Sequence, residues 1–303
     1  MKRLIALLGL VMMIACSDST TTKKTPNGFD YTVIRTGDGI LPKSGEVLVF
    51  DYIMKDSKDS LWLDTKESGM PMGLPIGDST SIDQEPGMIQ VFRLLSKGDS
   101  VSFNISVTKF FTEVSGGFVP PGIDTTRTLN FYVSVTGVMD MAAYQTLQME
   151  MMEKQSVAQL EKDGAEIDAY LKDNGIEAEK TEAGVRYVIT QEGEGENATS
   201  GQTVSVNYSG YLLDGTYFDS SVKEVAQEKG LYNEAREPYQ PYDVTIDQTS
   251  VIRGWHDALK VMKKGSKATV YIPSSLAYGP QRRSEEIKEN AILVFDLEVV
   301  DLK

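Results

Sequence analysis

Hydrophobic and polar residues alternate along several short stretches in the first half of the chain. One run covers residues 47–52, and a later one places hydrophobic side chains at every second position: Val101, Phe103, Ile105 and Val107. A period of two is typical of a half-buried β-strand, because successive side chains point to opposite faces of the sheet. The pattern begins at Gly28 and stops near Met139, so we predict a β-rich domain over residues 28–139.

Between Met139 and Lys180 the residues are mostly Met, Gln, Glu, Lys and Ala, without proline. Hydrophobic residues recur at helical spacing in two groups: Tyr144, Leu147 and Met151, then Ile167, Tyr170 and Leu171. Asn174-Gly175 fits the C-terminal cap of a helix. We predict a helical linker over residues 140–181, made of two helices with a break near Asp163-Gly164.

Methionines gather in and beside this linker, at Met139, Met141, Met149, Met151 and Met152. The unbranched methionine side chain adapts to many shapes, so the cluster fits a surface that binds client polypeptides. The alternative is an amphipathic linker that packs on a neighbouring domain, or on its own copy in a homodimer. The sequence leaves both interpretations open.

After Lys180 the chain returns to short alternating strands, and these repeat the first half. Residues 184–195 echo residues 28–39, and residues 201–208 echo residues 45–52, in both cases 156 positions apart. A fixed spacing between similar stretches indicates an internal repeat. We predict a second copy of the same fold over residues 182–303.

The second copy combines aromatic residues with a few polar groups. Tyr208 lies on a predicted strand, Phe218 follows a turn, and Trp255 leads the apolar face of a short helix. Aromatic residues in such a pattern usually form core. Asp219 beside Phe218, and the hydroxyl groups of Tyr208 and Tyr278, add the few orienting polar groups that are typical of an apolar binding pocket.

Five segments of this copy resemble FKBP-type peptidyl-prolyl cis-trans isomerases: residues 206–211, 214–221, 251–255, 272–279 and 293–296. They follow the family's order within residues 182–303, about 40% of the chain. The resemblance implies an α+β fold with two FKBP-like domains, each an antiparallel β-sheet wrapped on a short α-helix. It also implies an enzyme that isomerises X-Pro bonds in proline-containing polypeptides, accepts FK506-like macrolides, and uses no metal or other cofactor.

The resemblance also assigns site residues, position by position. The catalytic positions are Tyr208, Phe218, Asp219, Trp255, Tyr278 and Phe295, and the further substrate-binding positions are Tyr242, Val251, Ile252 and Ile287. Trp255 would form the floor under the proline ring, and the Ile252 amide and the Tyr278 hydroxyl would bind the ligand. Two departures are an insertion over residues 222–238 and a charged flap over residues 280–286.

The first copy lacks several of these residues. Met88 takes the place of Trp255, Phe111 falls at Tyr278, and Phe131 falls at Phe295. Either Leu63-Asp64 or Trp62-Leu63 stands for Phe218-Asp219, depending on one residue of loop length. We predict a retained fold with a degraded, inactive pocket, used for dimerisation or for capturing clients.

The first residues have the pattern of a signal segment. Lys2 and Arg3 precede an apolar run over residues 4–14, which is shorter than the about 20 residues that a membrane-spanning helix needs. The sequence Met13-Ile14-Ala15-Cys16 resembles the lipobox of bacterial lipoproteins, in which the cysteine is acylated and becomes the first mature residue.

The lipobox resemblance implies a signal peptide over residues 1–15, a lipid anchor at Cys16 and a flexible tether over residues 16–27. The protein would then sit in the cell envelope, held by its N-terminal lipid to the outer membrane or another membrane facing the periplasm. The alternative is an ordinary secretory signal with a chance cysteine.

Composition narrows the chemistry that the chain can perform. The 303 residues carry 30 basic and 44 acidic side chains, a net charge of −14, which repels phosphate backbones and argues against nucleic acid as a partner. One cysteine and one histidine cannot build a Cys/His zinc site. His256 is predicted to be a surface residue. An isomerase needs none of these groups; the alternative function is a non-catalytic chaperone or scaffold.

Overall fold

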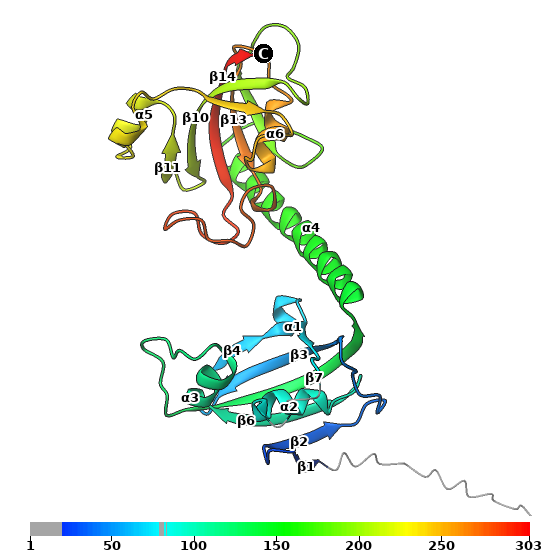
Figure 1. Cartoon of the computed structure of the whole chain (residues 1–303). Helices are drawn as coiled ribbons and strands as arrows, with labels where there is room; N and C mark the ends of the chain where they lie inside the picture. Colours follow the sequence, from blue (N-terminus) through cyan, green and yellow to red (C-terminus); the bar gives the residue numbers. More distant parts are fainter. Residues whose placement is uncertain (1–19, 79–81, 83) are drawn as a thin grey trace, which may run out of the picture. The chain divides into compact units, whose positions relative to one another are not determined.

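The computed structural model describes residues 20–78, 82 and 84–303 (Figure 1). The chain divides into two compact units, residues 1–151 and residues 152–303. Each unit contains one seven-stranded sheet, and in each a short helix contributes to the core. The predicted α+β fold class is confirmed, and a single long helix links the two sheets along the chain.

The sheet of the first unit has the strand order β1-β2-β6-β7-β3-β4, with β5 paired to β3. Its strands are β1 (Thr21–Lys24), β2 (Asp30–Arg35), β3 (Glu46–Asp56), β4 (Leu61–Asp64), β5 (Met72–Pro75), β6 (Ser100–Ser106) and β7 (Thr128–Asp140). Its helices are α1 (Thr65–Ser68), α2 (Gly87–Arg93), α3 (Val107–Lys109) and the π-helix η2 (Phe110–Val114). Buried and less buried residues alternate along β6 and most of β7, as the period-two pattern predicts.

The sheet of the second unit has the order β11-β10-β14-β13-β9-β8, with β12 paired to β10. Its strands are β8 (Glu179–Lys180), β9 (Arg186–Gln191), β10 (Thr203–Leu212), β11 (Tyr217–Ser220), β12 (Tyr242–Thr245), β13 (Lys267–Ile272) and β14 (Leu293–Leu302). Its helices are α5 (Lys223–Glu228), η3 (Glu234–Arg236), α6 (Arg253–Leu259) and η4 (Ser274–Leu276). Taken in chain order, the seven strands pair in the same way in both sheets.

The core helix of each unit lies very close to its neighbours. A Cβ atom on Gly87 of α2 would lie 2.5 Å from the Cβ of Phe29, and one on Gly254 of α6 would lie 2.3 Å from Cγ2 of Ile272. Real Cβ contacts are not this short, so glycine is what allows the approach. The apolar face of α6, which includes Trp255, then packs into the hydrophobic core of the unit, as do residues just after the helix.

The prediction of a flexible tether up to residue 27 is wrong for its last part. Thr21–Lys24 form β1, which pairs antiparallel with β2, and Thr25 is buried and accepts a hydrogen bond from the Phe29 amide at 3.0 Å. All four β1 side chains are exposed, so this edge strand has no hydrophobic alternation that would identify it. The signal peptide, Cys16 and the tether up to residue 19 lie outside the described residues.

The predicted break in the linker is also wrong, because α4 runs without interruption from Met141 to Asp173. Asp163 and Gly164 are buried within the second unit. A Cβ on Gly164 would lie 3.0 Å from Nη2 of Arg186, and that guanidinium donates to the Gly164 carbonyl at 3.2 Å. Glycine costs a helix about 1 kcal/mol relative to alanine; here it makes room for a buried arginine. The predicted C-cap is confirmed, with Gly175 at φ 65°.

The methionine cluster is divided between two environments. Met139 and Met151 line a cavity of about 460 Å³ in the first unit. The other three methionines of the cluster, Met141, Met149 and Met152, are exposed. Within the described part of the chain, no helix combines the length and the hydrophobicity that crossing a bilayer demands.

A buried carboxylate closes the turn between β3 and β4 of the first unit. The Asp56 side chain is fully buried, pairs with Arg127, and accepts hydrogen bonds from the Lys58 amide at 2.8 Å and the Ser60 amide at 3.0 Å. Burial alone would raise the pKa of this carboxyl, but the hydrogen bonds from Arg127 and the two amides hold the pKa far below its ordinary value of 3.8.

We therefore expect Asp56→Asn to destabilise the first unit at neutral pH and to do so less and less in acid. A depressed native pKa contributes stability above the unfolded pKa and loses it as the pH falls toward the native pKa. Exchange of the Lys58 and Ser60 amides should be faster in the variant at about pH 7. The difference between the free energies of opening should narrow progressively below about pH 4. Equal protection of these two amides in the wild type and the variant at neutral pH would contradict a stabilising role for the Asp56 carboxylate.

Candidate functional site

The second unit contains a cavity of about 500 Å³ between its sheet and helix α6. Nine of the ten pocket residues proposed from the sequence line it: Tyr208, Phe218, Asp219, Tyr242, Val251, Ile252, Trp255, Tyr278 and Phe295. The tenth, Ile287, is buried in the core of the unit and is not among the lining residues. Four further residues that line the cavity were not predicted from the sequence: Ser250, Arg253, Ala277 and Arg283.

Aromatic rings in edge-to-face contact form the base and one wall of the cavity. The Trp255 ring centroid lies 5.3 Å from that of Phe295 and 5.1 Å from that of Tyr208, and Phe218 meets Phe295 at 5.6 Å. Such pairs contribute about 0.5–1.5 kcal/mol each beyond the area they bury. Trp255 and Phe295 are buried, whereas Tyr242 is 46% exposed at the rim.

Gly210 on β10 lets two of these rings approach the backbone. A Cβ at this position would lie 2.6 Å from Cε2 of Phe218 and 2.7 Å from Cε1 of Phe295. The register places Gly210 opposite Asp219 on β11 and opposite Phe295 on β14. A side chain here would displace the two rings from their places in the cavity lining.

One corner of the cavity is polar. The Tyr208 hydroxyl donates to Oδ2 of Asp219 at 2.7 Å, and Arg236 pairs with Oδ1 of the same carboxylate. Nη2 of Arg236 also donates to the Tyr208 hydroxyl oxygen at 3.2 Å. Burial, followed by the hydrogen bond to Asp219, raises the pKa of Tyr208 to about 12, so the phenol stays protonated at neutral pH.

Arg236 comes from the segment inserted between β11 and β12, which packs on itself. Lys223 pairs with Glu237 at 2.6 Å, and the Tyr232 and Tyr239 rings stack at 5.9 Å. Arg236 lies within the insertion over residues 222–238 and is not among the site residues predicted from the sequence. It lies 17 positions after Asp219, and no local pattern marks it.

The charged flap also reaches the site. The Arg283 guanidinium lies 5.5 Å from the centroid of the Tyr278 ring, which is within the range of a cation–π contact. His256, next to Trp255 in the sequence, is not among the residues that line the cavity, and its Nδ1 accepts a hydrogen bond from the Asp247 amide at 3.1 Å. Within the described residues, no three His, Cys, Asp or Glu side chains are grouped to hold a metal ion.

Strand register decides how the first unit differs at the matching place. Met54 pairs with Leu63 on β4, whereas Gly210 pairs with Asp219 on β11. Leu63 therefore stands where the second unit has the carboxylate, and Trp62 stands where it has Phe218. Met54 is 7% exposed and belongs to the core of the first unit. At the same position of the second unit, the Phe218 and Phe295 rings occupy the space that a side chain on Gly210 would need.

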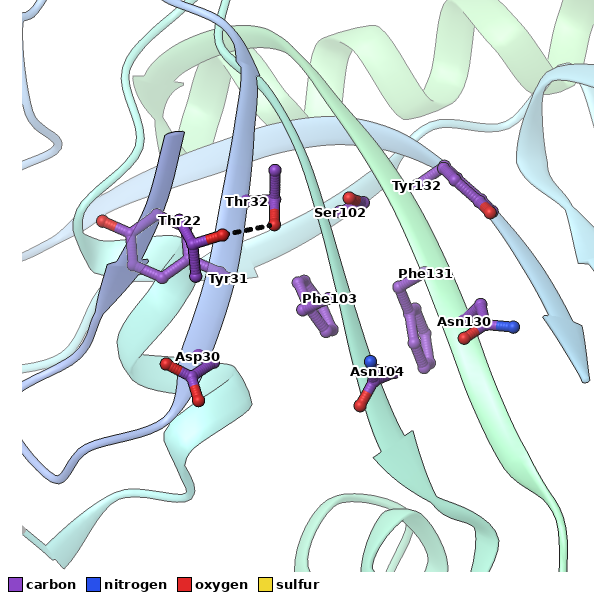
Figure 2. Close-up of a pocket in the computed structure, with 10 residues that line it drawn as sticks. All are labelled: Thr22, Asp30, Tyr31, Thr32, Ser102, Phe103, Asn104, Asn130, Phe131 and Tyr132. Carbon is purple, nitrogen blue, oxygen red and sulfur yellow. Dashed lines mark hydrogen bonds between the residues drawn. The ribbon is translucent and has the colours of Figure 1, made fainter. Parts of the chain in front are cut away.

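A different cavity of the first unit, of about 370 Å³, is drawn in Figure 2. It is lined by residues of β1, β2, β6 and β7, and hydroxyl, carboxylate and amide groups surround Phe103 and Phe131 (Figure 2). The Thr22 and Thr32 hydroxyls lie 3.3 Å apart at one edge. It has no helix among its lining and does not reproduce the aromatic pocket of the second unit.

Comparisons with known proteins agree with the geometry of the second unit. Residues 194–300 match the family described as FKBP-type peptidyl-prolyl cis-trans isomerase. The chain is 34% identical over 167 residues to a probable FKBP-type peptidyl-prolyl cis-trans isomerase FkpA of Neisseria meningitidis, covering 52% of this chain and 56% of that protein. It is 36% identical over 174 residues to FkpA of Escherichia coli, covering 54% and 57%.

A third relative is the outer membrane protein MIP of Legionella longbeachae, 33% identical over 163 residues, with 52% of this chain and 62% of that protein covered. Among solved structures, the crystal structure of FkpA from Escherichia coli matches with 31% identity and a TM-score of 0.37, covering 54% of this chain and 67% of that chain. The chain thus spans a little over half the length of these curated relatives.

Proposed function

We propose that the second unit, whose residues 194–300 belong to the FKBP-type peptidyl-prolyl cis-trans isomerase family, catalyses cis-trans isomerisation of X-Pro bonds in exported polypeptides. The observation that supports this most is the aromatic cavity with one polar corner at Asp219 and Tyr208. The substrates proposed are proline-containing polypeptides during folding.

The chemistry needs an environment rather than a nucleophile. Amide resonance sets a barrier of about 18–20 kcal/mol, and uncatalysed exchange takes tens to hundreds of seconds. In the twisted transition state resonance is lost and the imide is less polar, so an apolar, water-poor cavity binds it better than the planar ground state. A millionfold acceleration would require about 8 kcal/mol from all effects together.

The polar corner would act on the carbonyl that rotates. In this proposal the proline ring rests on Trp255, with the carbonyl that precedes it facing Asp219. Tyr208 and Arg236 both bind the Asp219 carboxylate, so they would hold its orientation. A fixed carboxylate costs no reorganisation when the carbonyl carbon becomes more electrophilic on twisting.

The first unit has a different proposed role. Its matching strand pairing and its distance of 156 positions in sequence support an internal duplication. In the first unit Met88 stands at the position of Trp255, Met54 at that of Gly210, and Leu63 at that of Asp219. We therefore propose that this unit is catalytically inactive and captures clients or mediates dimerisation. The same replacements in the first unit support the alternative function, a non-catalytic chaperone or scaffold.

We also propose that the protein is a lipoprotein of the cell envelope. The support is the lipobox-like sequence ending at Cys16, together with the name of the Legionella relative, an outer membrane protein. Removal of residues 1–15 would leave 28 basic and 44 acidic side chains, a charge of −16. An anionic membrane surface repels such a protein, so a covalent lipid would have to hold it.

Truncating either of two side chains that line the pocket should abolish most of the isomerase activity. In the chain from Ser17 onward, Phe218→Ala and Asp219→Ala should each lower kcat/KM by about tenfold or more, which is ~1.4 kcal/mol of transition-state stabilisation. The measurement is a protease-coupled assay with a proline tetrapeptide, and circular dichroism confirms that the variants are folded. Unchanged rates in both variants would rule out this pocket as the active site.

Displacing two rings that line the pocket should weaken ligand binding. In a Trp62→Phe background Trp255 is the only tryptophan, so its emission reports the second unit alone. An FK506-like macrolide should change that emission, and Gly210→Met should remove the response because its side chain collides with Phe218 and Phe295. The matched control is Met54→Gly in the first unit, which should leave the response in place. A Gly210→Met protein that still binds the macrolide would contradict the proposal.

Cys16→Ser should release the protein from the membrane or leave it uncleaved. Two or more acyl chains give stable attachment, at about 0.8 kcal/mol per buried methylene. Isomerase activity should persist, because the pocket begins more than 190 residues later in the sequence. The measurement is fractionation together with incorporation of labelled palmitate. Failure of the wild-type chain to take up label, or a processed variant that still sediments with membranes, would show that the anchor is not lipid.

A further inference from the structure

Asp163, in the second half of α4, is a buried carboxylate that the proposed chemistry does not use. It is 1% exposed. Its Oδ2 accepts hydrogen bonds from the Ser274 amide at 2.7 Å and the Ser274 hydroxyl at 2.6 Å, and Nε2 of Gln159 donates to its Oδ1 at 2.6 Å. Burying a carboxylate is costly unless its oxygens receive such donors. The carboxylate and Ser274 therefore hold each other in a single arrangement.

Ser274 in turn holds the backbone on both sides of Tyr278. Ser274 is fully buried at the start of η4, and its carbonyl accepts hydrogen bonds from the Ala277 and Gly279 amides, both at 2.8 Å. The Gly279 carbonyl is bound further by the Asn290 amide at 2.7 Å. Tyr278, which lines the cavity, lies between the two amides that share the Ser274 carbonyl.

We propose that Asp163 is a positioning residue for Tyr278, acting through Ser274 from a helix outside the matched family segment. The inference rests on the proposed isomerase function, because it assigns Asp163 a part in that reaction. Without the carboxylate, the Ser274 amide and hydroxyl lose their buried acceptor, the Ser274 carbonyl no longer holds one place, and Tyr278 samples other positions at the cavity. Precise placement of binding groups is what converts binding into rate.

A merely structural contact would have different consequences. Asp168, five residues further along α4, anchors the same helix by pairing with Arg186 at 2.8 Å. Losing Asp168 weakens the docking of the helix but leaves the contact between Asp163 and Ser274. Asp168→Ala is therefore a matched control that separates docking of α4 from placement of Tyr278.

The first test needs no activity. Hydrogen exchange of the Ala277 and Gly279 amides is compared in the chain from Ser17 onward, as wild type, Asp163→Ala, Asp163→Asn and Asp168→Ala. Loss of a charged hydrogen-bond acceptor should speed exchange of these two amides on the order of tenfold in Asp163→Ala. Asn keeps one carbonyl oxygen as acceptor, so Asp163→Asn should lie between Asp163→Ala and wild type; it also serves if the alanine variant does not fold. Unchanged exchange, or an equal rise in Asp168→Ala, would overturn the inference.

The second test is kinetic. Asp163→Ala should lower kcat/KM for a proline tetrapeptide by several-fold, on the order of the loss in Tyr278→Phe, and should add little in a Tyr278→Phe background. Asp168→Ala should leave kcat/KM close to wild type. Faster exchange in Asp163→Ala with unchanged kcat/KM, or fully additive losses in the double variant, would show that Asp163 does not act through Tyr278. An inactive wild-type chain would overturn the proposed function, and with it this role, while the exchange data still decide the contact itself.

Discussion

The arrangement of the second unit depends on how closely α6 lies against the sheet. Gly254 permits that approach, because any side chain at its position would overlap Ile272. The helix then buries its apolar face, and each fully buried large side chain contributes about 1.5–3 kcal/mol. Trp255 is carried on the same turn, so the packing that stabilises the unit also sets the tryptophan against Phe295 and Tyr208. Trp255, Phe295 and Tyr208 therefore belong both to the cavity lining and to the hydrophobic core.

The two units show that this framework alone does not make a pocket. Both have a glycine early in the helix and the same strand pairing. In the second unit Gly210 lets the cavity-lining rings of Phe218 and Phe295 lie against the strand, whereas in the first unit Met54 is buried in the core at the corresponding place. Protein interiors are close-packed, so the space beside this strand holds either the two cavity-lining rings in their observed places or a larger side chain.

Polar contacts from outside the helix and sheet complete the site. Arg236 reaches Asp219 from the insertion, and Asp163 reaches Ser274 from α4, 111 positions earlier. The first contact reaches Asp219 on strand β11, and the second reaches Ser274 in the segment that precedes Tyr278. Hydrogen bonds to charged groups contribute about 1.5–3 kcal/mol, more than neutral ones. Segments that look like a linker and a loop insertion therefore order the site.

The sequence by itself determined the features that depend on local pattern: the strands from their period of two, the apolar face of α6 and the C-cap at Gly175. Its resemblance to the isomerase family predicted ten pocket residues, of which nine line the cavity. The tertiary structure decided what depends on long-range neighbours. The exposed strand β1 has no hydrophobic signal, Gly164 continues a helix because Arg186 packs over it, and Ile287 is buried in the core instead of lining the cavity. The tertiary structure was also needed to find that Leu63 lies opposite Met54, that Arg236 pairs with Asp219, and that Asp163 binds Ser274. Periodicity reports which face of an element is buried, whereas pairing register and charge partners depend on residues far away in the chain.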